Sequence, residues 1–181
     1  VEFDGQTYQL LFAADGNGAY HVARAGSPAV FSVPTDKAAF LTTSYRDLLG
    51  DYLYNGNLAA LAGVEVSRSG KTTSISLHGD GQQMYGIVAG VSLPYAQLVP
   101  ALAPLYHIGI VGEVQDDERA EVEQALQRPP LATVTITKRD GQTDTLEFFA
   151  MDETHSFVRS NGRVSFIAYS RAALALEQAL E

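Results

Sequence analysis

The stretch that decides the fold is DGQTYQLLFAADGNGAYHVARAG, residues 4–26. It recurs without gaps, 136 positions later, as DGQTDTLEFFAMDETHSFVRSNG, residues 140–162. The two stretches share nine identical residues in 23 positions and both begin with Asp-Gly-Gln-Thr. Agreement of this extent is hard to reach by chance, and self-similarity at a fixed shift is the signature of a repeated structural unit. The sequence therefore predicts two related lobes.

Each copy has the pattern of a β-meander. Leu10 and Phe12 alternate with other residues in the first copy, and Leu146 and Phe148 do so in the second. Alternation with a period of two predicts a half-buried strand, and the preceding Asp-Gly pair is a hairpin signal. The further strands that we expect are Ala19–Arg24 and Ala29–Val33 in the first copy, and Thr133–Thr137, His155–Arg159 and Val164–Ala168 in the second.

A helical pattern follows each meander. Residues 36–49 carry Phe, Leu and Tyr at helical spacing and end at Gly50, which favours a helix stop. Residues 170–180 combine Leu and Ala, two residues of high helix propensity. We therefore expect a helix after each meander.

The segment between the copies resembles a weaker unit of the same kind. Strands are expected on either side of Ser69-Gly70 and again at Met84–Ala89. A helical pattern starts at Tyr95, but Pro100 predicts a short or broken helix because proline removes a backbone hydrogen bond. A strand at Leu105–Val114 and a helix at Asp116–Gln127 complete the segment.

These patterns predict an α+β fold. Antiparallel β-meanders carry helices packed on one sheet face, and the internal repeat gives two related lobes. We expect the first meander and helix at residues 1–62, a degenerate middle unit at 63–128, and the second copy at 129–181.

Composition excludes several classes of function. The 181 residues include 12 Lys and Arg against 21 Asp and Glu, a net charge of −9, which is the wrong sign for a nucleic-acid-binding surface. The absence of Cys excludes disulfides, thiolate metal sites and a Cys nucleophile. No apolar run reaches the roughly 18 residues that a bilayer requires. Because the chain begins at Val1 and not at Met, we expect any signal or anchor to lie outside it.

The residues from Arg128 to Gly141 carry a family resemblance. Pro129-Pro130 precedes the strand pattern Ala-Thr-Val-Thr-Ile and a Lys-Arg-Asp-Gly turn, and Gln6–Leu49 follows the same plan of strands, turns and helix. In these features the chain resembles the family called domain of unknown function 4340. The resemblance implies an extracytoplasmic domain of a membrane-anchored bacterial protein that is associated with ABC-type transport systems. It implies no catalytic residue.

Candidate site residues come from the tyrosines, of which there are nine, whereas Trp is absent. Tyr52 and Tyr54, flanked by Asn55 and Asn57, are candidates for an exposed aromatic lip that stacks on a sugar or grips a peptide. The pattern favours the other interpretation, in which both rings pack beneath the loop after the first helix.

Other motifs offer weaker sites. The four histidines, His21, His78, His107 and His155, lack the spacing of a metal motif, so no metal or cofactor is expected. Asp15-Gly16-Asn17-Gly18 resembles half of a calcium loop but fits a hairpin turn better. Ser156 beside His155 does not make a nucleophile and base, because neighbouring strand residues point to opposite faces.

The leading hypothesis is a non-enzymatic, extracytoplasmic binding or assembly module of a membrane-anchored bacterial protein, accessory to a transport complex. Its expected partner is a protein in that membrane complex, and the membrane itself is reached only through a segment outside this chain. The alternative is a cell-surface carbohydrate- or peptide-binding domain. A third hypothesis is a hydrolase whose residues converge only in three dimensions.

Overall fold

The computed structural model describes residues 2–3, 6–7, 9–38 and 51–181. The chain divides into two compact units, Val1–Leu48 and Leu49–Glu181, and each is described by itself. Both consist mainly of antiparallel strands, and the helices that the structure describes lie in the second, so the fold is α+β as the sequence predicts. Most of the helix expected at residues 36–49 lies outside the described residues.

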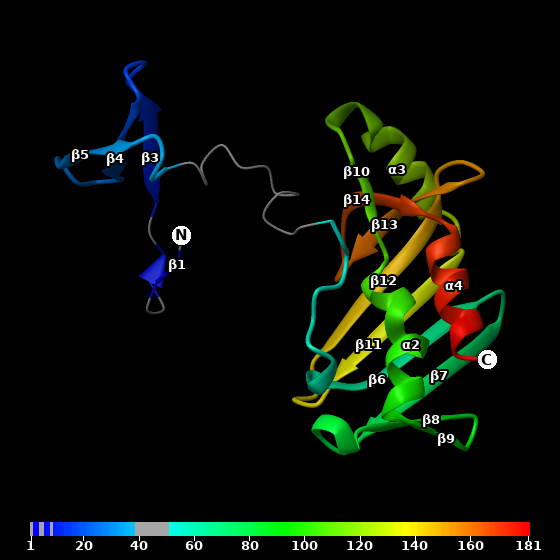
Figure 1. The fold of residues 1–181 in the computed structure, drawn as a ribbon. Coiled ribbons are helices and arrows are strands. Elements are labelled where there is room, and N and C mark those ends of the chain that lie inside the picture. The colour runs from blue at the N-terminus through cyan, green and yellow to red at the C-terminus, as the bar shows by residue number, and fades with distance from the viewer. Residues whose placement is uncertain (1, 4–5, 8, 39–50) are drawn as a thin grey trace. The chain divides into compact units, whose positions relative to one another are not determined.

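The first unit contains a short hairpin and a three-stranded meander (Figure 1). The hairpin pairs β1 (Glu2–Phe3) with β2 (Gln6–Thr7). The meander consists of β3 (Leu10–Ala14), β4 (Ala19–Arg24) and β5 (Val30–Pro34), all antiparallel. These strands coincide with the predicted ones to within a residue or two.

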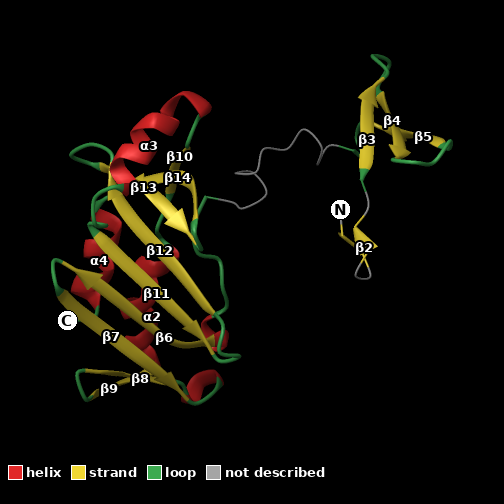
Figure 2. Ribbon diagram, turned by 180° about the vertical axis from the view of Figure 1, so that it is seen from behind, coloured by secondary structure: helices red, strands yellow, loops and turns green. Residues whose placement is uncertain are grey.

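The second unit is built on one nine-stranded antiparallel sheet (Figures 1 and 2). Its order is β10-β14-β13-β12-β11-β6-β7-β8-β9. The strands are β6 (Leu61–Arg68), β7 (Lys71–His78), β8 (Tyr85–Val88), β9 (Val91–Pro94), β10 (Ile110–Glu113), β11 (Ala132–Lys138), β12 (Thr143–Ala150), β13 (His155–Ser160) and β14 (Arg163–Tyr169). The expected segments 63–128 and 129–181 thus share a single sheet.

Each half of this sheet is a four-stranded meander followed by a helix. Strands β6 to β9 lead into α2 (Tyr95–Tyr106), and strands β11 to β14 lead into α4 (Arg171–Ala179). The halves meet where β6 pairs with β11, with Val66 opposite Val134 and Val64 opposite Ile136. All four of these side chains are buried, so the central pair of strands forms the middle of the core.

Two-residue turns set the register of the hairpins. Ser69 and Gly70 join β6 to β7, and Asn161 and Gly162 join β13 to β14. All four residues have positive φ, which is the geometry of the turn whose twist matches that of paired strands. Asn and Gly adopt this conformation at low cost, so these dipeptides fix which residues face each other.

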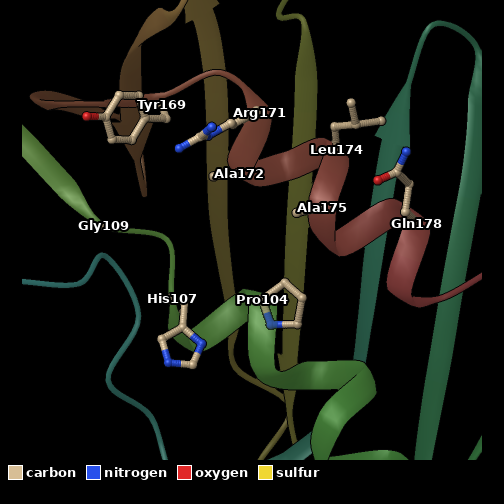
Figure 3. Close-up of a pocket in the computed structure, with 9 residues that line it drawn as sticks. All are labelled: Pro104, His107, Gly109, Tyr169, Arg171, Ala172, Leu174, Ala175 and Gln178. Atoms are coloured by element: carbon tan, nitrogen blue, oxygen red, sulfur yellow. The ribbon is translucent and has the colours of Figure 1, made fainter.

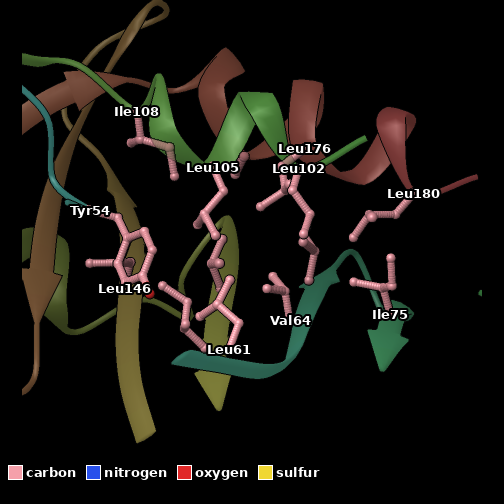
Figure 4. Close-up of a cluster of buried hydrophobic side chains, with 14 of the residues drawn as sticks. Tyr54, Leu61, Val64, Ile75, Leu102, Leu105, Ile108, Leu146, Leu176 and Leu180 are labelled. Carbon is pink, nitrogen blue, oxygen red and sulfur yellow. The ribbon is translucent and has the colours of Figure 1, made fainter. Parts of the chain in front are cut away.

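The main core lies between one face of the sheet and the helices α2 and α4 (Figure 4). Leu102 and Leu105 from α2 and Leu176 from α4 pack over Val64 and Leu146 of the sheet, and all five are buried. Burial of an aliphatic side chain of this size contributes about 1.5–3 kcal/mol. The two helices therefore anchor this face of the sheet.

The reverse face corrects one prediction, because not all helices lie on one side. A second cluster joins Val122 and Ala125 of α3 (Arg119–Leu126) to Phe149, Phe157 and Ile167. Phe149 alternates along its strand with Phe148, which belongs to the main core, so α3 covers the opposite face. The physical reason is that strands β12 to β14 carry apolar residues on both faces, and both need a cover.

Helix α2 corrects another prediction. It runs unbroken over twelve residues although Pro100 and Pro104 lie inside it. Pro100 is exposed, as is Ala96, whose carbonyl loses its partner four residues later. Water satisfies an exposed carbonyl, so the lost hydrogen bond costs less here than in a buried helix. Among the described residues, no helix is long and apolar enough to cross a membrane.

The three-stranded meander of the first unit and strands β12 and β13 share a pairing register. Leu10 lies opposite Arg24 and Phe12 opposite Val22. The residues 136 positions later, Leu146 with Ser160 and Phe148 with Val158, are opposite each other in the same way. Similar sequence therefore accompanies the same strand pairing in both places.

Candidate functional site

The four predicted site residues lie on the segment that leads into β6, and they do not act as one group. Tyr52 is 41% exposed and forms an isolated antiparallel bridge with Gly109. Its ring meets the ring of His107 edge to face, with 5.8 Å between centroids. Tyr52 is therefore available at the surface.

Tyr54 lies in the core. It is 6% exposed, and its ring packs at a tilt against Tyr106 with 5.4 Å between centroids. Burial raises the pKa of Tyr54 above its usual value of 10.0, with Asp144 adding to the effect. Because the segment around Tyr52 forms one isolated bridge and no continuous strand, residues spaced by two do not share a face. The two rings do not form a single exposed lip.

The two asparagines make local contacts. The side chain of Asn57 accepts a hydrogen bond of 2.9 Å from the Ala59 amide and caps the 3₁₀ turn Leu58–Ala60. The Asn55 amide donates to the Tyr52 carbonyl at 3.4 Å, a long hydrogen bond. Both asparagines are exposed. Ligand binding by Tyr52, Tyr54, Asn55 and Asn57 stays a prediction.

Tyr54 and Asn55 also border a cavity of about 260 Å³. The polar groups at its edge already have partners: Lys138 forms an ion pair of 2.8 Å with Asp144, and Asn161 donates to Asp144 at 3.1 Å. The carboxylate raises the pKa of Lys138. Groups that are paired in this way offer a ligand less than unpaired ones do.

A larger groove lies where the end of α2 faces α4 (Figure 3). Its volume is about 360 Å³. The lining residues are Pro104, His107, Gly109, Tyr169, Arg171, Ala172, Leu174, Ala175 and Gln178. The small side chains of Ala172 and Ala175 leave the space between the two helices (Figure 3). The groove thus combines an apolar body with a few polar groups, as ligand sites commonly do.

One end of this groove is a stacked array of rings and charges. The Arg171 guanidinium lies over the Tyr169 ring, 5.1 Å from its centroid, and His155 stacks on Tyr169 at 5.3 Å. Asp152 accepts a hydrogen bond of 2.9 Å from Nδ1 of His155. Hydrogen bonds from the Thr154 amide, and then from His155, hold the pKa of Asp152 far below its usual range.

His107 forms the other side of the groove. Its Nδ1 lies 2.8 Å from the Ala103 carbonyl, which can only accept, so Nδ1 carries the proton. The ring is exposed and contacts Tyr52. Tyr52, one of the predicted site residues, therefore lies next to the groove.

The remaining motifs have structural roles. Asp15 accepts hydrogen bonds from the amides of Asn17 at 2.7 Å and Ala19 at 3.0 Å, the hairpin turn that the sequence favours. These bonds lower the pKa of Asp15, the Ala19 contact most. In the part of the chain that the structure describes, no three His, Asp or Glu residues gather as a metal site.

Ser156 and His155 point away from each other, as their places on a strand require. Ser156 is fully buried, and its hydroxyl lies 2.7 Å from that of Ser170. His155 instead contacts Thr154 and Asp152. The two residues therefore do not form a nucleophile and its base.

Sequence reasoning missed the groove, because its polar residues come from separate elements. His107 follows α2, whereas Tyr169 and Arg171 lie where β14 meets α4. The sequence feature that could have indicated this groove is the pair Tyr169 and Arg171, which lie two residues apart at a strand-to-helix junction. Their approach to His107 depends on the packing of α2 beside α4, which no local pattern shows.

Comparisons with known proteins found no matching family model, no matching curated protein and no matching solved structure. The resemblance to domain of unknown function 4340 therefore stays a prediction.

Proposed function

We propose that the chain is a non-enzymatic, extracytoplasmic binding and assembly module of a membrane-anchored bacterial protein, accessory to a transport complex. The sequence resemblance supports the setting. The observation that carries the binding role is the apolar surface of the first unit, where Phe12 is 40% and Phe31 is 65% exposed. Monomeric proteins rarely expose large apolar side chains that lie together, and such patches commonly mark interaction sites.

These side chains share one face of the three-stranded sheet. Phe12 is opposite Val22, and Val22 is opposite Phe31, so the three lie in one row across the strands. Leu10, two residues before Phe12, is on the same face and is 37% exposed. We call Leu10, Phe12, Val22 and Phe31 the apolar row. A transporter subunit that covers it would bury aromatic area of the kind that dominates interfaces.

We also infer that this sheet and strands β12 to β14 are two copies of one repeated unit. The nine shared identities and the common pairing register of β3–β4 and β12–β13 support the inference. If it holds, Leu10, Phe12 and Val22 of the apolar row correspond to Leu146, Phe148 and Val158, which the second unit buries in its main core. In the part of the first unit that the structure describes, no helix covers the equivalent surface, which favours a partner from another protein.

Site-specific photo-cross-linking in native membranes tests the leading function. A photoreactive residue replaces Phe31 in one variant, and Gln97, an exposed polar residue of α2, in the control. We expect subunits of a transporter to cross-link from position 31 and not from position 97. Absence of transporter subunits, with the membrane complex shown to be intact, would contradict the proposal.

A second candidate function is the binding of a peptide or carbohydrate. The observation that favours it is the groove of about 360 Å³ between α2 and α4, with exposed tyrosines at Tyr52 and Tyr169 beside it. Peptide and glycan arrays test this function. Binding should fall in Tyr52→Ala and persist in the control Tyr95→Ala, which removes a similarly exposed ring at the other end of α2.

A further inference from the structure

The lining of the groove between α2 and α4 carries a cation, Arg171, on an acidic chain. The chain carries 21 acidic residues against 12 Lys and Arg. The described lining of the groove nevertheless contains Arg171 and His107 and no Asp or Glu. A local charge of the opposite sign attracts and orients an anion against the background of the whole molecule.

Arg171 is the group that would meet the anion. Its guanidinium lies over the Tyr169 ring, 5.1 Å from the centroid, and forms no ion pair with any residue that the structure describes. Stacking uses the flat face of a guanidinium and leaves its N–H edge available. That edge matches a carboxylate with two parallel hydrogen bonds.

The platform beneath Arg171 is held in place. Tyr169 stacks on His155 with 28° between the ring planes, and Asp152 binds the His155 ring. Asp152 in turn accepts amide hydrogen bonds of 2.7 Å from Thr154 and from His155. A ring fixed in this way positions the guanidinium before a ligand arrives, which lowers the entropy lost on binding.

The rest of the groove suits an apolar body. Pro104 and Leu174 are half-buried, and Ala172 and Ala175 provide a floor of methyl groups (Figure 3). The volume of about 360 Å³ lies at the small end of the range for ligand sites, which indicates a short occupant. The groove therefore combines one anion-binding edge with a small apolar surface.

We propose that this groove binds a carboxylate joined to a short apolar body, as at the C-terminus of a peptide that ends in an apolar residue. The inference rests on the second candidate function and names the chemistry of its ligand. Arg171 pairs with the carboxylate, and the last side chain lies over Ala172, Ala175 and Pro104. Free aliphatic carboxylates share this chemistry, so the test includes one.

The experiment is an NMR chemical-shift titration of the 181-residue chain with three probes. They are a tripeptide that ends in leucine, the same tripeptide with an amide-capped C-terminus, and hexanoate. We expect the free tripeptide to bind at least about tenfold more tightly than the amide, because charged hydrogen bonds to Arg171 are lost in the latter. Binding of hexanoate with equal affinity would identify a small carboxylate as the ligand; weaker binding would identify a peptide.

Three variants locate the site. Arg171→Gln should weaken the free tripeptide to the level of the amide. The control Arg163→Gln removes the same charge from an exposed position on β14, outside the groove, and should change nothing. Ala175→Leu fills the exposed floor without changing charge and should also block binding.

The outcomes separate the two proposals. If peptides bind but the amide binds equally and Arg171→Gln has no effect, the carboxylate inference fails while peptide binding stands. If no peptide or glycan on the arrays binds and hexanoate does not bind, both the inference and the second candidate function fail.

Discussion

Phe12 and Phe148 hold the same place in two stretches of similar sequence, yet one is 40% exposed and the other is fully buried. Their strands pair in the same register with β4 and β13 respectively. The difference lies in the surroundings: β12 has β11 as a second neighbour, and its face is covered by helices that contribute to the same core. Local sequence thus determines how strands pair, whereas burial depends on elements distant in the chain.

The largest expected effect comes from truncating these two rings. Phe148→Ala should lower the free energy of unfolding of the second unit by about 3–5 kcal/mol, because it leaves a cavity in the core. Phe12→Ala should cost less than about 1 kcal/mol in the first unit, since its ring remains partly solvated. Urea unfolding followed by circular dichroism measures both. Equal losses would show that the apolar row is buried in solution and would break the comparison.

The next effect concerns the contact that holds the covering helix. Glu177 of α4 is 5% exposed and pairs with Arg68 of β6 at 2.7 Å. Arg68→Ala leaves this buried carboxylate without its partner and should cost about 2 kcal/mol.

A second ion pair between the β6–β7 hairpin and the C-terminal end of the chain provides a matched control. Lys71 pairs with Glu181, and both side chains are about half exposed. Lys71→Ala should therefore change the free energy of unfolding by less than about 0.5 kcal/mol. Similar losses for Arg68→Ala and Lys71→Ala in chemical denaturation would mean that the burial of Glu177 does not secure α4.

A smaller effect is expected from a buried hydroxyl group whose hydrogen bonding is not satisfied within the described structure. The Tyr106 hydroxyl is buried and has no hydrogen-bond partner among the described residues. Tyr106→Phe removes this unpaired group and should raise the free energy of unfolding by about 1 kcal/mol. Tyr95→Phe, at an exposed ring on the same helix, is the control and should be neutral.

The same hydroxyl predicts a pH dependence. Burial raises the pKa of Tyr106 from 10.0 to about 12. A raised pKa favours the protonated form in the folded state. Ionisation of Tyr106 therefore leaves the free energy of unfolding unchanged below pH 10 and lowers it as the pH rises toward about 12. The wild-type chain should therefore lose more stability over this interval than Tyr106→Phe does. Parallel losses in alkaline unfolding series would contradict this assignment.

Much of the fold was accessible from sequence, because it depends on local signals. The strands Ala19–Arg24 and His155–Arg159 follow from alternation and turn residues, and the helix before Pro129-Pro130 follows from its acidic start and its stop. The unbroken α2 was not predicted, since whether water reaches the Ala96 carbonyl depends on tertiary packing. The packing of α3 on Phe149 and Phe157, on the reverse face of the sheet, also depends on tertiary structure and was not predicted.

The candidate site was less accessible. Tyr52 and Tyr54 look equivalent in sequence. In the structure Tyr52, which bridges to Gly109, has an exposed ring, whereas the ring of Tyr54 is buried in the core. The groove at Arg171 depends on two helices that are far apart in the chain and lie together over one sheet. Pairing between such elements carries no signature in the spacing of residues.

The smallest expected effect concerns the two turns that correspond in the compared regions. Asp15 in the β3–β4 turn and Asp152 in the β12–β13 turn both accept backbone amide hydrogen bonds, which lower the pKa of each carboxyl below 3.8. The stabilisation from each is therefore present above that pH and is lost as the pH falls through the lowered pKa.

Asp152 differs because His155 adds a side-chain hydrogen bond. His155→Ala should raise the pKa of Asp152 in an NMR titration, yet keep it below 3.8, because the amide of Thr154 makes the largest contribution. Asp15 should not respond in that variant. A return of Asp152 to its ordinary pKa would mean that the imidazole, and not the turn backbone, holds the carboxylate, and the two turns would then work by different physics.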